Sequence, residues 1–140
     1  MKKYLFLGFV FLANYCAAQS KEEIAVRQLL NGQTQAWNRG DIDLFMKTYW
    51  ESDSLMFVGK NGVTYGWINT LNNYKKNYPD TTAMGKLSFD ILLTKRLSFQ
   101  YFYVIGKWHL LRSIGDLSGH YTLLLKKIKG KWVIVADHSS

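Results

Sequence analysis

The chain is poor in cysteine and proline. Cys16 is the only cysteine among 140 residues, and Pro79 is the only proline. One thiol near the N-terminus excludes an internal disulfide framework and a zinc site built from paired cysteines. The sequence also contains no internal repeat, low-complexity stretch or linker. These absences leave one domain that an ordinary hydrophobic core must hold together.

Motifs for metal, phosphate and nucleophilic chemistry are also missing. The three histidines form neither His-x-His nor His-Glu-x-x-His, and no glycine-rich phosphate loop is present. His138 with Ser139 does not make a catalytic triad, because neighbouring residues of a strand point to opposite faces. Asp137 is expected to point away from His138 for the same reason. We therefore expect neither a metal site nor a cofactor.

The one long apolar run lies at the N-terminus. Two lysines precede the mostly apolar segment Tyr4–Tyr15, and small residues end at Ala18. This pattern predicts a secretory signal peptide over residues 1–18, cleaved between Ala18 and Gln19, and an exported domain over residues 19–140. A lipoprotein signal at Cys16 or an uncleaved anchor are the alternatives, but the run is shorter than the roughly 20 residues that a spanning helix needs. The mature chain is thus expected to be periplasmic or secreted, without a membrane span.

Basic residues exceed acidic ones by 18 to 10. The densest group flanks a predicted hairpin turn and comprises Lys126, Lys127, Lys129 and Lys131. Such a group is typical of a solvated turn whose charges discourage the edge of the sheet from pairing with another chain. A nucleic-acid surface would need a basic stripe with stacking aromatics, so we expect no nucleic-acid partner. A weak attraction to anionic surfaces stays open.

Helix signals come first along the chain. Ser20 and Glu23 form a capping-box pattern before a helix that Gly40 ends. Asp41 is a good N-cap for a second helix. A short hairpin, with strands at 54–58 and 63–65, surrounds an Asn-Gly turn. A third helix begins at Gly66 and ends before Pro79.

From residue 86 onward the pattern changes to strands, expected at 87–97, 100–111, 118–128 and 131–139. Gly106 within the second of these indicates a bulge or bend. Helices followed by a run of strands predict an α+β layer architecture. Aromatic residues on both faces suit a sheet that curves around a cavity.

Several short motifs occur in the order and spacing of a known superfamily. They are Ala36–Asp41, Phe45–Trp50, Phe57–Gly59 with Gly62, Tyr74, Tyr78–Pro79, Ser118–Leu123, Gly130–Val135 and Asp137–Ser140. In these motifs the chain resembles the nuclear transport factor 2-like superfamily, and more narrowly the SnoaL-like family called domain of unknown function 4440. The resemblance covers about the whole of residues 19–140.

The resemblance implies a cone-shaped α+β fold, in which three N-terminal helices pack on a strongly curved antiparallel sheet that encloses a pocket. The superfamily includes ketosteroid isomerases, polyketide cyclases, scytalone dehydratase and non-catalytic association domains, so the fold does not fix the function. The isomerases place a carboxylate base near the position of Phe57–Gly59 here, where this chain has none. They also use an acid and a tyrosine as an oxyanion hole, and Tyr49 with Asp90 is an open candidate for that pair.

His138 is the first candidate catalytic residue, because it lies on the last predicted strand and an imidazole can act as acid or base near neutral pH. His120 is the second. A hairpin loop of three residues places His120 opposite His138, whereas a loop of two residues places it opposite Ser139. In the first register both histidines share the pocket face.

The remaining candidates would contact a ligand. Arg112, at the end of a strand, could bind a carboxylate or phosphate. Four aromatic residues are expected to line the pocket beside His120, His138 and Arg112. They are Trp37, Tyr49, Tyr74 and Tyr103. Trp108 and Trp132 are expected to pack the sheet and the hairpin.

Three hypotheses follow. The first is a protein that binds a small apolar or amphipathic ligand in an aromatic cavity with polar histidine and arginine contacts. The second is an isomerase, cyclase or dehydratase with His138 as general acid or base. The third is a non-catalytic interaction module that forms a homodimer through its open sheet face.

Overall fold

The computed structural model describes residues 20–140. The predicted signal peptide, residues 1–18, lies outside the described residues. Within residues 20–140 the structure has no helix with the length and apolar character needed to cross a membrane.

The first two helices begin where their capping residues predict. α1 is Lys21–Asn38, and the Ser20 side chain accepts a hydrogen bond from the Glu23 backbone N–H at 3.1 Å. The Glu23 carboxylate does not complete the capping box, because it contacts Arg27 and Thr94 instead. α2 is Ile42–Met46, and Asp41 caps it through the Leu44 backbone N–H at 2.8 Å. Gly40 separates the two helices with a φ of 79°, the left-handed conformation that glycine adopts without strain.

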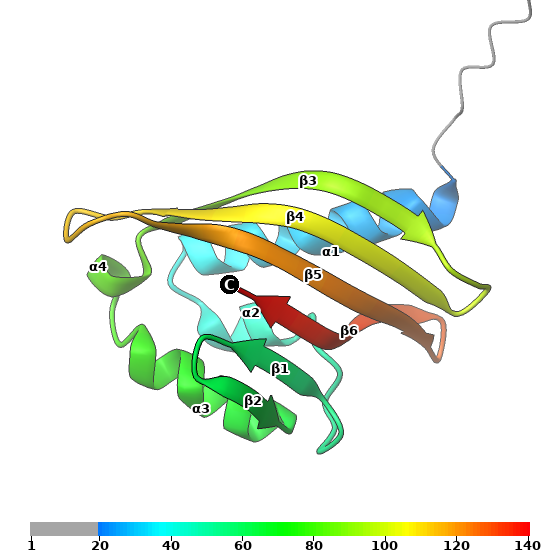
Figure 1. Ribbon diagram of the computed structural model, residues 1–140, viewed down its shortest axis with the longest axis horizontal. Coiled ribbons are helices and arrows are strands. Elements are labelled where there is room, and N and C mark those ends of the chain that lie inside the picture. The colour runs from blue at the N-terminus through cyan, green and yellow to red at the C-terminus, as the bar shows by residue number, and fades with distance from the viewer. Residues whose placement is uncertain (1–19) are drawn as a thin grey trace, which may run out of the picture.

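The sheet has six strands in the order β2-β1-β6-β5-β4-β3. The strands are β1 (Met56–Gly59), β2 (Gly62–Tyr65), β3 (Lys86–Arg96), β4 (Tyr101–Leu111), β5 (Leu117–Ile128) and β6 (Lys131–Ser139). Neighbouring strands are antiparallel except β1 and β6, which are parallel. Figure 1 shows the long strands β3, β4 and β5 running side by side, with the short β1–β2 hairpin beyond β6.

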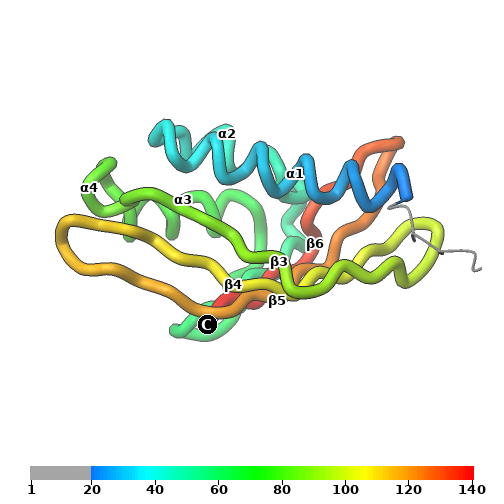
Figure 2. Tube along the Cα trace, turned by 90° about the horizontal axis from the view of Figure 1, so that it is seen from above, coloured from blue at the N-terminus to red at the C-terminus, as the bar shows by residue number. Residues whose placement is uncertain are grey.

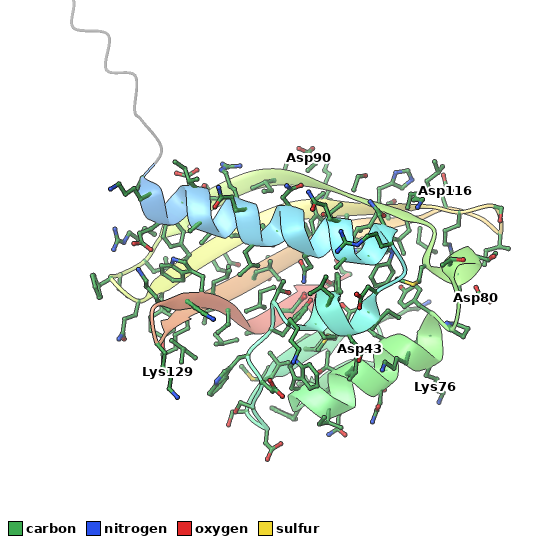
Figure 3. The ribbon with its side chains drawn as sticks, turned by 180° about the vertical axis from the view of Figure 1, so that it is seen from behind. Asp43, Lys76, Asp80, Asp90, Asp116 and Lys129 are labelled. Atoms are coloured by element: carbon green, nitrogen blue, oxygen red, sulfur yellow. The ribbon has the colours of Figure 1, made fainter. Side chains whose placement is uncertain are left out.

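The helices cover one face of the curved sheet. Figure 2 shows α1, α2 and α3 (Trp67–Asn77) on the same side of β3, β4 and β5. Seen from behind, α1 lies across the sheet (Figure 3). α4 (Thr81–Met84) is a single turn before β3 that the sequence pattern did not predict. Its carbonyl at Met84 accepts a hydrogen bond from the Trp37 indole at 3.1 Å, which fixes the end of α1. The expected α+β architecture with a curved, mostly antiparallel sheet is confirmed.

A bulge in β6 decides which residues face the interior. Ile128 pairs with Lys131 and Leu125 with Ile134, but Leu124 pairs with Ala136, so Val135 is an extra residue. An extra residue reverses the alternation of side chains beyond it. Ile134 is therefore buried before the bulge, and Asp137, rather than its even-numbered neighbours, is buried after it.

Candidate functional site

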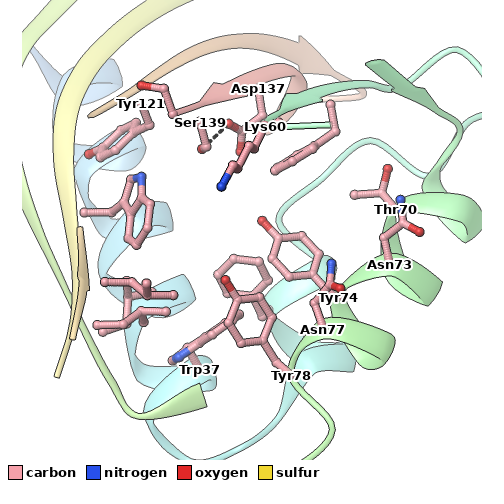
Figure 4. Close-up of a pocket in the computed structure, with 18 of the residues that line it drawn as sticks. Trp37, Lys60, Thr70, Asn73, Tyr74, Asn77, Tyr78, Tyr121, Asp137 and Ser139 are labelled. Carbon is pink, nitrogen blue, oxygen red and sulfur yellow. Dashed lines mark hydrogen bonds between the residues drawn. The ribbon is translucent and has the colours of Figure 1, made fainter. Parts of the chain in front are cut away.

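A cavity of about 480 Å³ lies between the helices and the inner face of the sheet. α1, α2 and α3 supply one wall, and residues from all six strands supply the rest of the lining. A volume of this size is within the usual range for sites that hold small molecules. Figure 4 shows this cavity, with Asp137 and Ser139 on one side and Trp37, Tyr74 and Tyr78 on the other.

The helical wall is aromatic. Its aromatic residues are Trp37, Phe45, Tyr49, Tyr74 and Tyr78, and Phe57 of β1 joins them. They pack mostly edge to face, with ring centroids 4.9 Å apart for Trp37 and Tyr78 and 5.2 Å apart for Phe45 and Tyr74. Edge-to-face packing favours one fixed arrangement of the rings. The wall is therefore a preformed apolar surface.

Two glycines shape the sheet wall. Gly106 pairs with Tyr121, and Gly119 pairs with Trp108, so the two aromatic residues lie diagonally on the inner face of β4 and β5. A Cβ at Gly106 would overlap the Tyr121 ring. Because glycine has no side chain, the Tyr121 ring can lie close against the strand beside it. The sequence prediction of an irregularity at Gly106 corresponds to a bulge in the neighbouring strand β3.

Asp137 is the acidic group of the cavity. Its side chain comes from β6, and the residue is only 5% exposed. The Tyr49 hydroxyl donates a hydrogen bond to Oδ2 at 2.7 Å, and the Ser139 hydroxyl donates to Oδ1 at 2.9 Å. Each carboxylate oxygen thus has one protein donor, and further lone pairs remain for a donor on a ligand.

Burial controls the protonation of this group. Desolvation raises the pKa of Asp137 from 3.8 to about 6, although the hydrogen bonds from Tyr49 and Ser139 act in the opposite direction. Burial also raises the pKa of Tyr49 and of Tyr74 well above the usual phenol value, and the nearby charge of Asp137 adds to both shifts. The two phenols therefore stay protonated, while Asp137 can exchange a proton near neutral pH.

The mouth of the cavity is polar. Its exposed polar lining residues are Lys60, Asn61, Asn73, Asn77, Ser118 and Ser140, and Gly62 and Leu117 are also exposed there. Lys60 and Asn61 belong to the β1–β2 turn, whereas Asn73 and Asn77 lie on α3. In Figure 4 the Lys60 side chain extends into the space above Tyr74. A ligand would thus pass polar groups before it reaches the aromatic interior.

Of the four aromatic residues predicted to contact a ligand, three line the cavity and one does not. Trp37, Tyr49 and Tyr74 all line the cavity. Tyr103 pairs with Leu124 on the outer face of the sheet and does not line the cavity. Trp108, which was expected only to pack the sheet, is part of the cavity wall.

Arg112 has a structural position beside the site. Its Nε donates to the Gly115 carbonyl at 2.7 Å, and one terminal nitrogen donates to the Ala83 carbonyl at 3.2 Å. These bonds connect the β4–β5 turn to α4, and Arg112 does not line the cavity. Its charge reaches the site only indirectly, since it lowers the pKa of Tyr78 against the larger raising effect of burial.

The expected placement of His138 and His120 on the pocket face is wrong. His138 pairs with Thr122, and both histidines are exposed and absent from the cavity lining. They do share a face of the sheet, but it is the outer face. The cause is the bulge at Val135, which turns Asp137 and Ser139 inward and His138 outward.

Asp137 is the residue that sequence reasoning missed. It was set aside because it points away from His138, which is true, but the face that it points to is the inner one. Its partner also differs from expectation, because Tyr49 bonds Asp137 rather than Asp90. Residues 57–59 contain no carboxylate. Phe57 nevertheless lies beside Asp137 through the parallel β1–β6 pairing.

The arrangement can bind and exchange protons. In residues 20–140 no three His, Cys, Asp or Glu side chains converge where they could hold a metal ion. The one carboxyl group of the cavity lining lies beside two phenols, and the buried Tyr121 hydroxyl and Trp108 indole N–H in the same lining have no hydrogen-bond partner among the described residues. The carboxyl group can accept a hydrogen bond from a ligand, or take and return a proton.

Comparisons with solved structures place this geometry in a family. A nuclear transport factor 2-like protein of unknown function from Shewanella oneidensis is 44% identical, with a TM-score of 0.82 over 85% of this chain and 98% of that one. A ketosteroid isomerase-like protein from Erwinia carotovora is 17% identical, with a TM-score of 0.68 over 87% of this chain and 97% of that one. A nuclear transport factor 2-like protein of unknown function from Pseudomonas putida is 15% identical, with a TM-score of 0.68 over 85% of each chain.

The two more distant structures share the fold alone. No protein-family model matches the sequence, and the curated proteins contain no match to it. The Shewanella protein, however, is similar in sequence along almost its entire length. On that similarity, and on the cone of helices and curved sheet described above, the chain belongs to the nuclear transport factor 2-like superfamily.

Proposed function

We propose that this protein binds a small apolar or amphipathic organic molecule in the cavity, with Asp137 as the polar contact. The observation that carries the proposal is a cavity of about 480 Å³ with aromatic walls and one buried carboxyl group. Burial of apolar ligand surface would supply most of the binding free energy, at about 25 cal/mol per Å² before the costs of association. A single polar group then sets the orientation of the ligand.

The protonation state of Asp137 limits which ligands the cavity can bind. With a pKa of about 6, the carboxyl group is mostly ionised at neutral pH. An ionised carboxylate only accepts hydrogen bonds, so the ligand should carry a hydroxyl or amine donor. The aromatic walls require the rest of the molecule to be apolar.

The test compares two tryptophan variants on the same helix. Asn77 lines the mouth of the cavity, whereas Asn72 does not, and both are exposed residues of α3. Asn77→Trp should obstruct the mouth, and Asn72→Trp should not. Purified wild-type protein and both variants are compared by native mass spectrometry before and after denaturation, and by thermal shift with a library of small aromatic alcohols and amines.

The proposal predicts a co-purified molecule, or a shift with library compounds, for wild-type protein and Asn72→Trp. Asn77→Trp should lose the same signal. Equal responses from both variants would place binding outside the cavity, and no response from wild-type protein to any compound would reject this ligand class.

A second candidate function is acid–base catalysis at Asp137. The supporting observation is the pKa of about 6, which lies near that of an effective general base at neutral pH. The nearby protonated phenols Tyr49 and Tyr74 could stabilise an oxygen anion that forms when a proton leaves the carbon beside a carbonyl group.

If Asp137 acts as a base, the protein should catalyse the exchange of substrate C–H protons for deuterium from solvent. A panel of apolar ketones in D₂O, followed by proton NMR, should show exchange at the carbon next to the carbonyl with wild-type protein. The Asp137→Asn variant should lose that exchange while still binding the ketone. Exchange that persists in Asp137→Asn would exclude Asp137 as the base.

Export and self-association complete the proposal. The apolar N-terminal sequence supports export, which N-terminal sequencing of protein from the cell envelope and medium would test.

The outer sheet face exposes Leu93 by 42% and Met56 by 41%, and such apolar exposure supports a homodimer through this face. Light scattering should give twice the chain mass, whereas a monomer at working concentration would reject the dimer.

A further inference from the structure

Within residues 20–140, one end of the molecule carries the whole formal net charge. The basic end, as we define it, consists of Lys21, Lys95, Arg96, Lys126, Lys127, Lys129 and Lys131. Residues 20–140 contain 16 of the 18 lysines and arginines and all 10 acidic residues. Seven of those 16 are in the basic end, where Glu22 is the one acidic residue. The other nine basic residues are matched by nine acidic residues over the rest of the chain.

The basic end is formed by three segments, namely the start of α1, the β3–β4 turn and the β5–β6 hairpin, and specific contacts join them. The Lys127 backbone N–H donates to the Gln100 carbonyl at 2.8 Å, which joins the β5–β6 hairpin to the β3–β4 turn. Lys127 Nζ and the Trp132 indole both bond Glu22 at the start of α1, at 2.9 Å and 2.7 Å. Figures 1 and 2 both show the two hairpin turns and the start of α1 at the same end of the sheet.

The β3–β4 turn adds an exposed apolar tip to these charges. Phe99 is 75% exposed and Leu97 is 52% exposed. The Arg96 guanidinium lies 5.9 Å from the centre of the Phe99 ring. A large aromatic and an aliphatic side chain in solvent, with cations around them, cost solubility unless they have a partner.

We propose that the basic end binds an anionic lipid membrane surface, with Phe99 and Leu97 entering the headgroup region. Lysine and arginine clusters are attracted to the negative potential of anionic lipids, and apolar side chains at the same place add hydrophobic burial at the interface. Phe99 alone could stack on a base, whereas Leu97 has no flat ring. Both side chains can be buried at a lipid interface, and this pair therefore favours lipid over nucleic acid.

The position of the basic end is compatible with the cavity. No residue of the basic end, and neither Leu97 nor Phe99, lines the cavity. Figure 3 shows Lys129 at one end of the molecule and Asp80 and Asp116 toward the other. A docked protein would therefore hold Asp80 and Asp116 away from an anionic surface and keep the cavity mouth free. Ser20, at which the apolar N-terminal sequence joins the fold, also lies at the basic end.

The test is vesicle co-sedimentation with two kinds of lipid. Vesicles of phosphatidylglycerol and phosphatidylcholine in equal parts are compared with vesicles of phosphatidylcholine alone, at low and high NaCl. The proposal predicts binding to the anionic vesicles that weakens as salt rises. The Lys95→Glu/Lys131→Glu variant should bind at least about tenfold more weakly, since each basic residue near the surface contributes roughly fivefold.

Matched controls separate the basic end from net charge and from general apolar exposure. Arg39→Glu/Lys76→Glu makes the same change in net charge at exposed positions elsewhere and should bind as wild-type protein does. Phe99→Asn should weaken binding several-fold, whereas Ile114→Asn, at a 61% exposed position in the opposite hairpin turn, should not. Circular dichroism establishes that each variant is folded.

Three results would overturn the proposal. Wild-type protein could fail to bind anionic vesicles at low salt. Both charge-reversal variants could weaken binding equally, which would make the attraction a property of net charge. Single-stranded DNA or RNA could bind more tightly than vesicles with the same loss in Lys95→Glu/Lys131→Glu, which would make the basic end a nucleic-acid surface.

Discussion

The Tyr49 hydroxyl donates a 2.7 Å hydrogen bond to Oδ2 of Asp137 across 88 positions of the sequence. Both residues are almost fully buried, with 3% and 5% of their surfaces exposed. The bond joins the segment after α2 to the end of β6, and it crosses the interior at the cavity wall. The same contact therefore contributes to the fold and favours the ionised form of Asp137, against the effect of burial.

Removal of the Tyr49 hydroxyl should destabilise the protein in a pH-dependent way. Tyr49→Phe leaves the Asp137 carboxylate with one donor fewer, and a hydrogen bond to a charged group contributes about 2 kcal/mol. The loss should be largest above pH 6 and smaller below pH 4, where the carboxyl group is neutral. Urea unfolding at pH 7.5 and pH 4 measures it. Tyr65→Phe, at a 59% exposed tyrosine, should change the unfolding free energy by less than about 0.5 kcal/mol.

Asp137 should make stability fall as pH rises. Its folded pKa of about 6 exceeds its unfolded value of 3.8, so the folded state binds the proton more tightly. The stabilisation is complete below pH 4 and is lost as pH rises to 6, by about 3 kcal/mol. Asp137→Asn should remove this dependence and be more stable than wild-type protein at pH 7.

The difference between wild-type protein and Asp137→Asn is the quantity to follow, because Glu22 and Glu23 have lowered pKa values and act in the opposite direction. Denaturant unfolding from pH 4 to pH 8 gives this difference. A difference that stays constant over that range would contradict the raised pKa.

The exposed histidines and the buried aspartate should behave differently in ligand binding. His138→Ala should leave binding and stability within experimental error, because His138 lies on the outer face of β6. Asp137→Asn should change the affinity for any ligand with a hydroxyl or amine donor. Isothermal titration with the library compound that binds most tightly distinguishes the two variants. A loss of affinity in His138→Ala alone would identify His138 as the ligand contact.

Two glycine-to-alanine substitutions should have opposite effects on the free energy of unfolding. Gly106→Ala places a methyl group against the buried Tyr121 ring, and such overpacking costs about 1–3 kcal/mol. Gly32 lies in α1 with no atom within 4 Å of its missing Cβ, so Gly32→Ala should stabilise the helix by about 0.5–1 kcal/mol. Thermal unfolding of both variants measures the signs. Equal destabilisation would mean that Tyr121 does not lie against β4.

Local chemistry made much of the fold predictable. Ser20 and Asp41 cap helices because their side chains satisfy free backbone N–H groups, and Gly40 ends α1 because it adopts a positive φ. The strand of residues 131–139 was predicted with its observed bounds. α4 was missed because a four-residue helix has too little periodicity to be recognised.

The chemistry of the site was not predictable in the same way. One extra residue in β6, Val135, exchanges the inner and outer faces for everything that follows. No glycine or proline marks that bulge in the sequence. Trp37, Tyr49 and Tyr74 were found because large rings favour burial and their segments lie outside the bulged strand. His138 and Asp137 were assigned to the wrong faces because they follow the bulge in β6.

Asp137 is a desolvated carboxyl group at the wall of the cavity. Carbon-13 NMR of the side-chain carboxyl carbon, titrated from pH 3 to pH 8 and assigned with Asp137→Asn, tests this desolvation most directly. A desolvated Asp137 should titrate with a midpoint at about 6. A midpoint at or below 3.8 would contradict it, because a solvated or ion-paired carboxyl group would titrate there.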